Sequence, residues 1–367
     1  MKNVLVIAGK LYIGGAELVC RNIGYYADPK LFQIDYLVFG DEVGPYEPKL
    51  EEKGCRIWHV PSPSESYRAF YKELKRLIRE NQYEIVHCHT MFNSGLVLRA
   101  AKRCGVPGRI AHSHSIKGPE HRGMLQNLYE KTMRRWILKD ATHLIGCGQA
   151  AGEWLFGKKA FQKKGLVLLN GIDLDRFRYN PQTRDRIRRE NHWEDCFLIG
   201  HVGHLASVKN QAFLLRLMPA LLEKKPNAHL LLLGEGSDRP MLESLIQELH
   251  LQRAVTMPGN VPNVNDYLSA MDVFAFPSLY EGMPLSILEV QANGLPCLIS
   301  DRVPKDVFLT DLLKPLPLEA PLQWLEQLLT VGRLAPEQYL LKMQNTSADL
   351  RQMLKKLYQI YQDETIG

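Results

Sequence analysis

The sequence predicts an α/β protein with two doubly wound units in tandem, each built on a parallel sheet. Short apolar runs typical of buried strands alternate with longer helical patterns throughout the chain. The alternation restarts near residue 190, and 367 residues suit two domains of ordinary size. We therefore expect a first domain over residues 1–170 and a second over 171–340. Residues 341–367 should form a C-terminal helix that folds back onto the first domain.

The elements follow in order along the chain. In the first half, strands are expected at 4–8, 33–39, 85–88, 109–112, 143–147 and 166–169, and helices near 16–27, 66–80, 94–103, 122–138 and 148–156. In the second half, strands are expected at 197–202, 229–233, 255–257, 273–275 and 297–299, and helices near 211–224, 238–249, 263–270 and 284–293. One long helical pattern runs from about 336 to 361. Open α/β sheets bind ligands beyond the carboxyl ends of their strands, so residues that follow strands are the candidates for function.

The composition is that of a globular protein, with 45% hydrophobic and 23% charged residues. No apolar run approaches the roughly 20 residues needed to span a bilayer. The first residues read as a buried strand rather than as a signal peptide. The seven cysteines are scattered without a Cys-x-x-Cys pair, which fits reduced thiols. We expect a cytoplasmic protein.

The net charge of +6 is unevenly distributed. Residues 1–165 hold 26 Lys and Arg against 16 Asp and Glu, and the remainder holds 20 against 24. A basic first half favours an anionic partner such as membrane headgroups, although a solvated surface explains it equally well. No basic patch interleaved with aromatic residues indicates nucleic acid, which we do not expect as a partner.

The segment 280–289 carries the strongest chemical pattern. It reads as a loop after a buried strand and the start of a helix, with Pro284 expected at the first helical position. The free N–H groups of a first helical turn form an anion site. Glu281 stands at the mouth of this turn and Glu289 lies further along the helix. A phosphate site between two carboxylates indicates a sugar nucleotide, whereas two solvated surface glutamates are the alternative.

Two further loops follow the first strand of each unit. In 200–210, Lys209 precedes a helix, where a cation is poorly placed unless an anion also binds, so we predict a diphosphate ligand there, assisted by His204. The pair Gly14-Gly15 opens the first helix and allows close approach of a ligand to the backbone. A simple turn is the alternative for this pair.

Four histidines end two strands, at positions 87, 89, 112 and 114. Alternation should place His87 with His89 on one face and His112 with His114 on another. No acidic or cysteine ligands accompany them, so we assign no metal and expect histidines that are packed or that bind a hydroxyl or phosphate. The Asp173-Leu174-Asp175 run is interpreted as a turn and helix cap, again without metal.

Together these motifs resemble the retaining glycosyltransferases of family 4, which have the GT-B fold of two Rossmann-like domains facing across a cleft. The resemblance covers most of the chain and rests on Gly14-Gly15, on 170–173, on Glu281 and Glu289 with their spacing, and on the turn at 292–296. The phrases at 111–114, 154–157 and 200–203 are similar to the branch that builds bacterial capsule or exopolysaccharide.

The resemblance implies a role for each candidate. Glu281, His114 and Lys209 would be catalytic: Glu281 would bind hydroxyls of the donor sugar, His114 would lie near sugar and acceptor, and Lys209 would neutralise the leaving diphosphate. Glu289 would bind ribose hydroxyls. The remaining substrate-binding positions would be Gly14, Gly15, Gly203, His204, Gly282, Met283, Pro284 and Leu285.

One departure from the family pattern stands at His204, where arginine is usual. A neutral imidazole offers one donor in place of a permanent charge and a fork, so the leaving group would be stabilised less. Two other functions stay open. One is a nucleotide-sugar 2-epimerase of the same fold, and the other, which His204 favours, is a non-catalytic partner that binds nucleotide sugars.

The expected reaction transfers a hexose or N-acetylhexosamine from a nucleotide diphosphate, UDP by preference, to a lipid-linked saccharide with retained configuration. No cofactor or metal is expected, because the protein supplies the cations. The helix pattern at 126–139 places Lys and Arg beside apolar residues. It predicts either docking on an anionic membrane surface or an ordinary half-buried helix.

Overall fold

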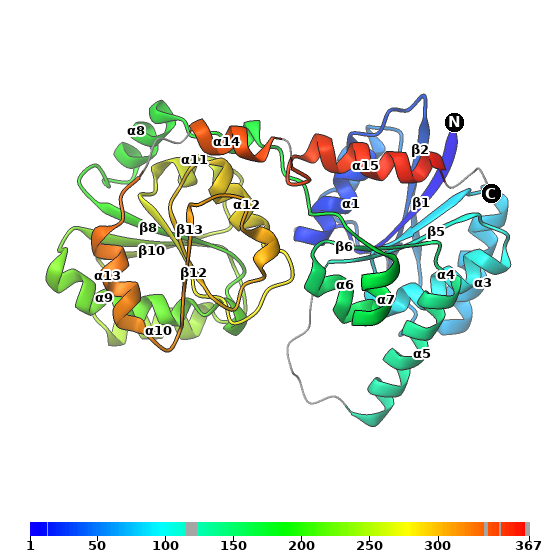
Figure 1. Ribbon diagram of the computed structural model, residues 1–367, viewed down its shortest axis with the longest axis horizontal. Coiled ribbons are helices and arrows are strands. Elements are labelled where there is room, and N and C mark those ends of the chain that lie inside the picture. The colour runs from blue at the N-terminus through cyan, green and yellow to red at the C-terminus, as the bar shows by residue number, and fades with distance from the viewer. Residues whose placement is uncertain (13, 115–122, 334–336, 345, 364–367) are drawn as a thin grey trace. The chain divides into compact units, whose positions relative to one another are not determined.

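The computed structural model describes residues 1–12, 14–114, 123–333, 337–344 and 346–363. The chain divides into two compact units (Figure 1). Unit 1 comprises Met1–Gly171 and Arg351–Gly367, and unit 2 comprises Ile172–Leu350. Each unit has a sheet of its own with helices on both faces, which is the doubly wound arrangement that the alternating pattern predicts.

Unit 1 has a seven-stranded sheet in the order β3-β2-β1-β4-β5-β6-β7, and every pair of neighbours is parallel. The strands are β1 (Lys2–Gly9), β2 (Phe32–Phe39), β3 (Ile57–Val60), β4 (Ile85–Cys88), β5 (Gly108–Ser113), β6 (His143–Gly146) and β7 (Gly165–Val167). The order reverses between β1 and β4, so this sheet has a switch point where ligands of doubly wound folds bind.

The helices of unit 1 cover both faces of its sheet (Figure 1). They are α1 (Gly15–Tyr25), α2 (Glu47–Glu51), α3 (Tyr67–Glu80), α4 (Ser94–Arg103), α5 (Met124–Asp140), α6 (Gln149–Phe156) and α7 (Lys158–Lys164), with a 3-10 turn at Met91–Asn93. Successive residues of a strand face opposite sides. In β1, Leu5 and Ile7 join the core cluster under α3 and α4, while Val4 and Val6 are fully buried on the other face. The central strand is therefore apolar on both faces, as its sequence predicts.

The last helix, α15 (Leu350–Asp363), belongs to unit 1. Lys2 Nζ donates to the carbonyl oxygens of Tyr361 and Gln362, at 3.0 and 2.6 Å. Tyr358 and Tyr361 pack their rings against Phe32 of β2, with centroids 5.1 and 5.8 Å apart. The C-terminal helix thus covers the start of β1 and β2.

Unit 2 repeats the architecture with six parallel strands in the order β10-β9-β8-β11-β12-β13. The strands are β8 (Phe197–Val202), β9 (Ala228–Leu233), β10 (Val255–Gly259), β11 (Val273–Phe276), β12 (Cys297–Ser300) and β13 (Leu313–Leu316). The helices are α8 (Pro181–Glu190), α9 (Gln211–Lys224), α10 (Arg239–Glu248), α11 (Val264–Ala270), α12 (Leu285–Ala292), α13 (Pro321–Thr330) and α14 (Glu337–Met343), with 3-10 turns at Asp175–Phe177, Ser207–Lys209 and Lys305–Val307. Its core cluster centres on α9, α10 and the fully buried Trp324.

The structure corrects several expectations about the elements. The strands β3 and β13 and the helices α2, α7, α8 and α13 were not predicted. The long helical pattern from 336 to 361 is not one helix among the described residues, but the two helices α14 and α15. Between them Asp349 forms a parallel bridge with Ile172, and both Ile172 and Leu350 use backbone N–H groups in this contact. The backbone around Asp349 is therefore paired with Ile172 as a β-bridge and does not continue the helix.

Candidate active site

In unit 2 the structure joins two of the predicted residues, Lys209 and Glu281. Lys209 ends the 3-10 turn after β8, and Glu281 lies in the loop between β11 and α12. Lys209 Nζ donates to Glu281 Oε1 at 2.7 Å, and the two side chains are only 18% and 10% exposed. An ammonium and a carboxylate so shielded from water must be paired, because either charge alone would be costly there. The pair presents a preorganised cation beside a loop that follows two neighbouring strands.

The surroundings hold this ion pair in place. Leu279 N–H donates to the carbonyl oxygen of Val208 at 2.8 Å, so the loops after β8 and β11 are bonded to each other. Asn210, which adopts a left-handed backbone with φ of 56°, donates from its amide to the carbonyl oxygen of Pro277 at 3.2 Å. The ammonium of Lys209 also lies 5.1 Å from the centre of the Phe276 ring. The position of the cation is therefore fixed from several sides.

Gly203 and His204 lie at the carboxyl end of β8. A Cβ at Gly203 would stand 3.6 Å from the stem of Lys209, an ordinary van der Waals distance, so Gly203 lies directly against this side chain. The imidazole of His204 is exposed, and its backbone oxygen accepts a hydrogen bond from Gln211 at 2.9 Å. His204 therefore stands at the surface next to the cation rather than within the buried pair.

A third loop at this edge was missed by the sequence analysis. Gly234, at φ of 142°, approaches so closely that a Cβ would stand 2.0 Å from the carbonyl oxygen of Gly203. Leu205 N–H donates to the carbonyl oxygen of Glu235 at 2.9 Å. The two glycines around Glu235, in the run Gly234-Glu235-Gly236, are the signal that was available in the sequence.

The helix α12 begins one residue later than expected. Pro284 is its N-cap, with extended backbone, and Leu285 is the first helical residue. Pro284 was predicted at the first helical position. Its ψ of 110° is not helical, and its carbonyl oxygen already accepts from Ile287 N–H at 3.1 Å. No side chain caps this helix, so the first-turn amides of Leu285 and Ser286 lack the partner that a cap would give.

Glu289 is the second carboxylate of the pattern and lies on α12. Burial raises its pKa to about 7, and the charge of Arg176 offsets part of that effect. A carboxyl group with such a pKa is only partly ionised near neutral pH. The ionised carboxylate of Glu289 is poorly solvated, so hydrogen bonds donated by a ligand would stabilise it.

In unit 1 the glycine pair stands at the start of α1. Gly14 is the N-cap, in extended conformation and without a side-chain cap, and Gly15 begins the helix and is exposed. A Cβ at Gly14 would lie 2.3 Å from Oε2 of Glu17, which therefore folds back over the helix N-terminus. Negative charge is favoured at that end of a helix. The Glu17 carboxylate therefore occupies the N-terminus of α1, where an anionic ligand group would also be stabilised.

The four histidines lie on a single face of the unit 1 sheet, contrary to expectation. His87 of β4 is in register with Ile110 of the parallel strand β5, so these two side chains point to the same face. Alternation along each strand then brings His89, His112 and His114 to that face as well. The prediction of two faces was wrong because it treated each strand alone and did not include the register.

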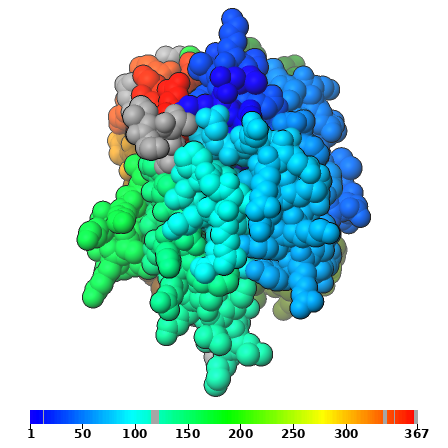
Figure 2. All heavy atoms as spheres, turned by 90° about the vertical axis from the view of Figure 1, so that its right-hand side faces the viewer, coloured from blue at the N-terminus to red at the C-terminus, as the bar shows by residue number. Residues whose placement is uncertain are grey.

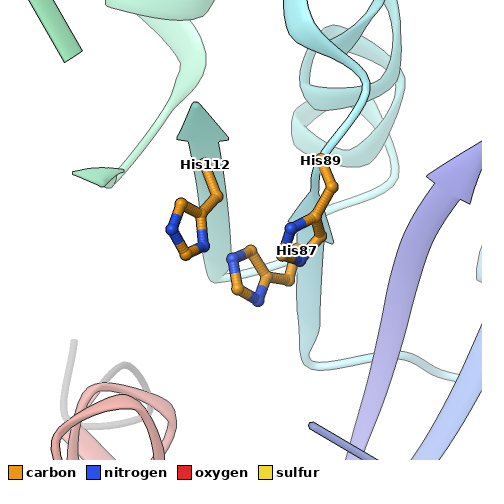
Figure 3. Close-up of side chains that lie close together, drawn as sticks. All are labelled: His87, His89 and His112. Carbon is orange, nitrogen blue, oxygen red and sulfur yellow. The ribbon is translucent and has the colours of Figure 1, made fainter. Parts of the chain in front are cut away.

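The imidazoles lie close to one another, and Figure 3 shows three of them, those of His87, His89 and His112. Ring centres are 4.2 Å apart for His87 and His89 and 4.1 Å apart for His112 and His114. His89 Nδ1 and His114 Nε2 share a hydrogen bond of 2.6 Å. The first three histidines are buried, whereas His114 is partly accessible. His114 is thus the member of the group that a ligand reaches.

All four histidines are neutral at physiological pH. Burial lowers the pKa of His87 to about 3 and that of His114 to about 4, where Asn170 offsets part of the effect. Burial, followed by the neighbouring imidazoles, holds the pKa of His89 and of His112 well below the usual range. A proton placed on any one of them would be poorly solvated and would repel its neighbours.

The remaining run, Asp173-Leu174-Asp175, forms the expected turn. Asp173 Oδ1 accepts the backbone N–H of Arg176 at 3.3 Å, just before the 3-10 turn at Asp175–Phe177. The predicted residues therefore gather at two places. Lys209, Glu281 and Gly203 cluster in unit 2 with α12 beside them, and Gly14, Gly15 and His114 follow strands of unit 1.

Solved structures share this architecture along the whole chain. HepE from Anabaena in complex with UDP-glucose superimposes with a TM-score of 0.82 over 99% of this chain and 100% of that one, at 18% identity. WaaG, a glycosyltransferase of lipopolysaccharide biosynthesis, superimposes with a TM-score of 0.65 over 97% of this chain and 99% of that one, also at 18% identity. Two Rossmann-like units of this kind define the GT-B class of proteins.

Family models and curated relatives identify the family. Residues 13–176 match the model of glycosyltransferase family 4, and residues 183–308 match that of glycosyl transferases group 1. EpsF of Bacillus subtilis, provisionally assigned as a glycosyltransferase, is 35% identical over 83% of this chain and 81% of its own. CapH of Staphylococcus aureus, a capsular polysaccharide biosynthesis glycosyltransferase, is 24% identical over the full length of both chains. The chain belongs to the family 4 glycosyltransferases, on the branch with bacterial capsule and exopolysaccharide enzymes.

Proposed function

We propose that this protein transfers a hexose or N-acetylhexosamine from a UDP-sugar to a lipid-linked saccharide, with retention of the anomeric configuration, in the synthesis of a surface polysaccharide. Unit 2 binds the donor and unit 1 the acceptor. The observation that carries the proposal is the shielded ion pair of Lys209 and Glu281 beside the uncapped start of α12.

Glycosyl transfer requires positive charge next to the leaving diphosphate, and the ion pair of Lys209 and Glu281 supplies it. As the bond to the sugar breaks, negative charge grows on the diphosphate and the sugar becomes oxocarbenium-like. Lys209 and the first-turn amides of α12 face the growing charge without needing to reorganise, and each such donor contributes on the order of 3 kcal/mol. Glu281 orients Lys209 through Oε1 and leaves Oε2 for a hydroxyl of the sugar.

The remaining candidates complete the site. Glu289 binds the ribose hydroxyls, and the backbone at Gly282, Met283 and Leu285 contacts the diphosphate and sugar. His114 contacts the sugar and acceptor from unit 1. The acceptor proton passes to the leaving phosphate oxygen, so no separate base is required.

Relatives support the donor and acceptor classes. A galactosyltransferase of Escherichia coli that uses UDP-Gal and GlcNAc-diphosphoundecaprenol is 27% identical over 73% of this chain and 72% of its own. A lipid-linked acceptor would be met at the inner face of the cell membrane, which supports a peripheral location there as part of the proposal. No helix among the described residues has the length and apolar character to cross a bilayer.

The helix α5 supports membrane contact. It extends beyond the rest of unit 1 (Figures 1 and 2), and its Met124, Leu125 and Leu128 are 87%, 84% and 62% exposed. A hollow of about 380 Å³ beside them is lined by Leu128 and Trp136 and by basic residues, namely Arg99, Lys131, Arg135 and Lys139. Exposed apolar residues with a basic surround fit an anionic headgroup layer. Sedimentation with vesicles should therefore rise with their anionic lipid content.

The proposal is tested in two stages with purified protein. A thermal-shift screen of nucleotide diphosphates and their sugars should raise the melting temperature most for uridine compounds. The selected UDP-sugar is then incubated with undecaprenyl-diphosphate-linked saccharide, and NMR of the product should show the anomeric configuration of the donor. Tight binding without transfer to any such acceptor, or an inverted product, would contradict the proposal.

Metal independence has a separate test. Because Lys209 and the amides supply the positive charge, adding Mg²⁺ or Mn²⁺ should leave the rate of transfer unchanged. A rate that rises in proportion to added Mg²⁺ would show instead that an oxygen-bound cation bridges the diphosphate.

A further inference from the structure

The buried histidines of unit 1 have ring nitrogens that the fold leaves without partners. Nε2 of His87, Nε2 of His89 and both nitrogens of His112 are buried and make no hydrogen bond among the described residues. A buried polar atom without a partner costs about 1–3 kcal/mol. Four such atoms from three neighbouring side chains are unusual in a core and point to a partner that the side chains themselves do not supply.

The nitrogens that do have partners show a consistent pattern. His87 Nδ1 is bonded to Tyr361 Oη at 2.6 Å, and His89 Nδ1 is bonded to His114 Nε2 at 2.6 Å. In both rings Nδ1 is held by a neighbour and Nε2 is left over. Histidines that ligate metals are commonly arranged in this way, with one nitrogen fixed by a hydrogen bond and the other turned to the ion.

We propose that His87, His89 and His112 form a binding site for a divalent transition metal of the zinc class, with Tyr361 and His114 as the supporting residues. One nitrogen from each of the three rings lies within 4.8 Å of the others. Tetrahedral coordination at about 2.0–2.1 Å would bring these atoms to roughly 3.4 Å from each other. The three side chains lie close together in Figure 3, and binding an ion would require the rings to turn toward a common point, because those of His87 and His112 are stacked at 6°.

The ligand chemistry selects the class of ion. Imidazole suits Zn²⁺, Co²⁺, Ni²⁺ and Cu²⁺, whereas Mg²⁺ and Ca²⁺ require oxygen ligands, which this trio does not supply. Three histidines leave a fourth position for water or a ligand.

The site goes beyond the proposed transfer and does not depend on it. The residues assigned to the diphosphate belong to unit 2, whereas this trio links β4 and β5 of unit 1 and, through Tyr361, the C-terminal helix α15. A bound ion would stabilise unit 1 by mass action. It would also fix the tautomer of His114 through His89.

Metal content, rather than activity, tests this proposal. Untagged protein is stripped with a chelator and titrated with Zn²⁺, and separately with Co²⁺, whose visible spectrum reports tetrahedral nitrogen ligation. We expect one ion per chain, a tetrahedral Co²⁺ spectrum and a higher melting temperature on loading. A wild-type protein that stays folded and takes up no ion would overturn the proposal.

Variants locate the ion. His87→Ala and His112→Ala should each lower Zn²⁺ affinity by at least about tenfold, in the range found when metal-site residues are altered. His229→Ala is the matched control, because His229 lies in unit 2 and is bonded to Thr256. Circular dichroism confirms which variants are folded, and the wild-type Co²⁺ spectrum remains the deciding measurement if none is. Folded His112→Ala that keeps one tightly bound ion would contradict the assignment.

Discussion

The two units share one architecture but carry opposite chemistry at the carboxyl ends of their strands. In unit 1 four neutral imidazoles lie in contact at the carboxyl ends of β4 and β5. In unit 2 the loops after β8 and β11 hold a shielded ion pair, with a carboxyl group of raised pKa nearby on α12. The parallel sheet gives both units a place for a ligand. The proposed ligands differ with the residue types: a charged diphosphate for unit 2, and neutral hydroxyls or a zinc-class ion for unit 1.

The largest expected effect removes the cation of unit 2. Lys209→Ala should lower the rate of transfer on the order of 10²–10³-fold, because the leaving diphosphate loses its preorganised positive charge. The substitution also leaves the carboxylate of Glu281 unpaired in a shielded place, so the free energy of unfolding should fall. Transfer assays with a thermal melt of each variant separate the two effects.

The control for this substitution is Lys224→Ala, an exposed lysine at the end of α9. It should change neither transfer nor stability measurably. In the double variant Lys209→Ala/Glu281→Ala, the two losses should not add, because the residues act as one pair. Full additivity would indicate that Lys209 and Glu281 work independently.

The next effect separates the units. His114→Asn should lower transfer about 10²-fold, because a contact that positions the acceptor is lost, while the affinity for UDP stays unchanged, because His114 belongs to unit 1 and the candidate nucleotide ligands belong to unit 2. Isothermal titration with UDP and the transfer assay make the comparison. His143→Asn, at the start of β6, serves as the control in the same unit. A matching loss of UDP affinity in His114→Asn would contradict the proposal that unit 2 alone binds the nucleotide.

The contrast between the two units was only partly predictable from sequence. Apolar runs such as Val4–Ile7 and the spacing of helices were enough to predict both sheets. The edge strands β3 and β13 were missed because they are short and mixed: β13 holds Lys314 and Pro315, and β3 leaves Trp58 half-buried. A proline is tolerated at a sheet edge, and it removes the signal by which strands are found.

The candidate residues were predicted more easily than their contacts. Lys209 was predicted from its place just before a helix and Glu281 from its place in a loop. The two residues are 72 positions apart, and no local pattern indicates that they pair. The gathering of the histidines depends on the register of β4 and β5, which is set by packing rather than by either strand alone. Local patterns thus predict which residues lie at a strand end, and tertiary structure decides which of them meet.

A third prediction uses the raised pKa of Glu289. Ribose hydroxyls donate to the ionised carboxylate, so the affinity for UDP should increase as pH rises through about 7 and level off above it. Between pH 6 and pH 8 the ionised fraction changes by about tenfold, which sets the upper limit on the change in affinity. Titrations at fixed ionic strength measure it. Glu289→Gln should bind weakly and with little dependence on pH, and an unaltered pH profile in that variant would remove Glu289 from the site.

The same group makes a prediction about stability, with the sign reversed. The folded-state pKa of Glu289 is raised to about 7 from the ordinary 4.5, so ionisation costs the folded protein stability as pH rises from about 4.5 to 7. Glu289→Gln removes that cost. Without ligand, the variant should be more stable than the wild type at pH 8, by at most about 3 kcal/mol, and of similar stability near pH 4. Denaturant titrations at both pH values test this, and equal stability at pH 8 would contradict the burial of the charge.

The smallest effect concerns His204, where the family usually has arginine. His204 is exposed beside the ion pair, so a longer side chain has room to reach solvent or ligand. An arginine adds a permanent charge and a planar fork that matches phosphate oxygens, which is worth about 1 kcal/mol at an accessible position. His204→Arg should therefore raise kcat/KM about fivefold, with the larger part of the gain in UDP affinity. His204→Lys separates charge from geometry, because it supplies the charge without the fork. A slower enzyme with either substitution would mean that His204 contributes through its own imidazole, and the positive charge offered to the diphosphate would then come from Lys209 and the helix amides alone.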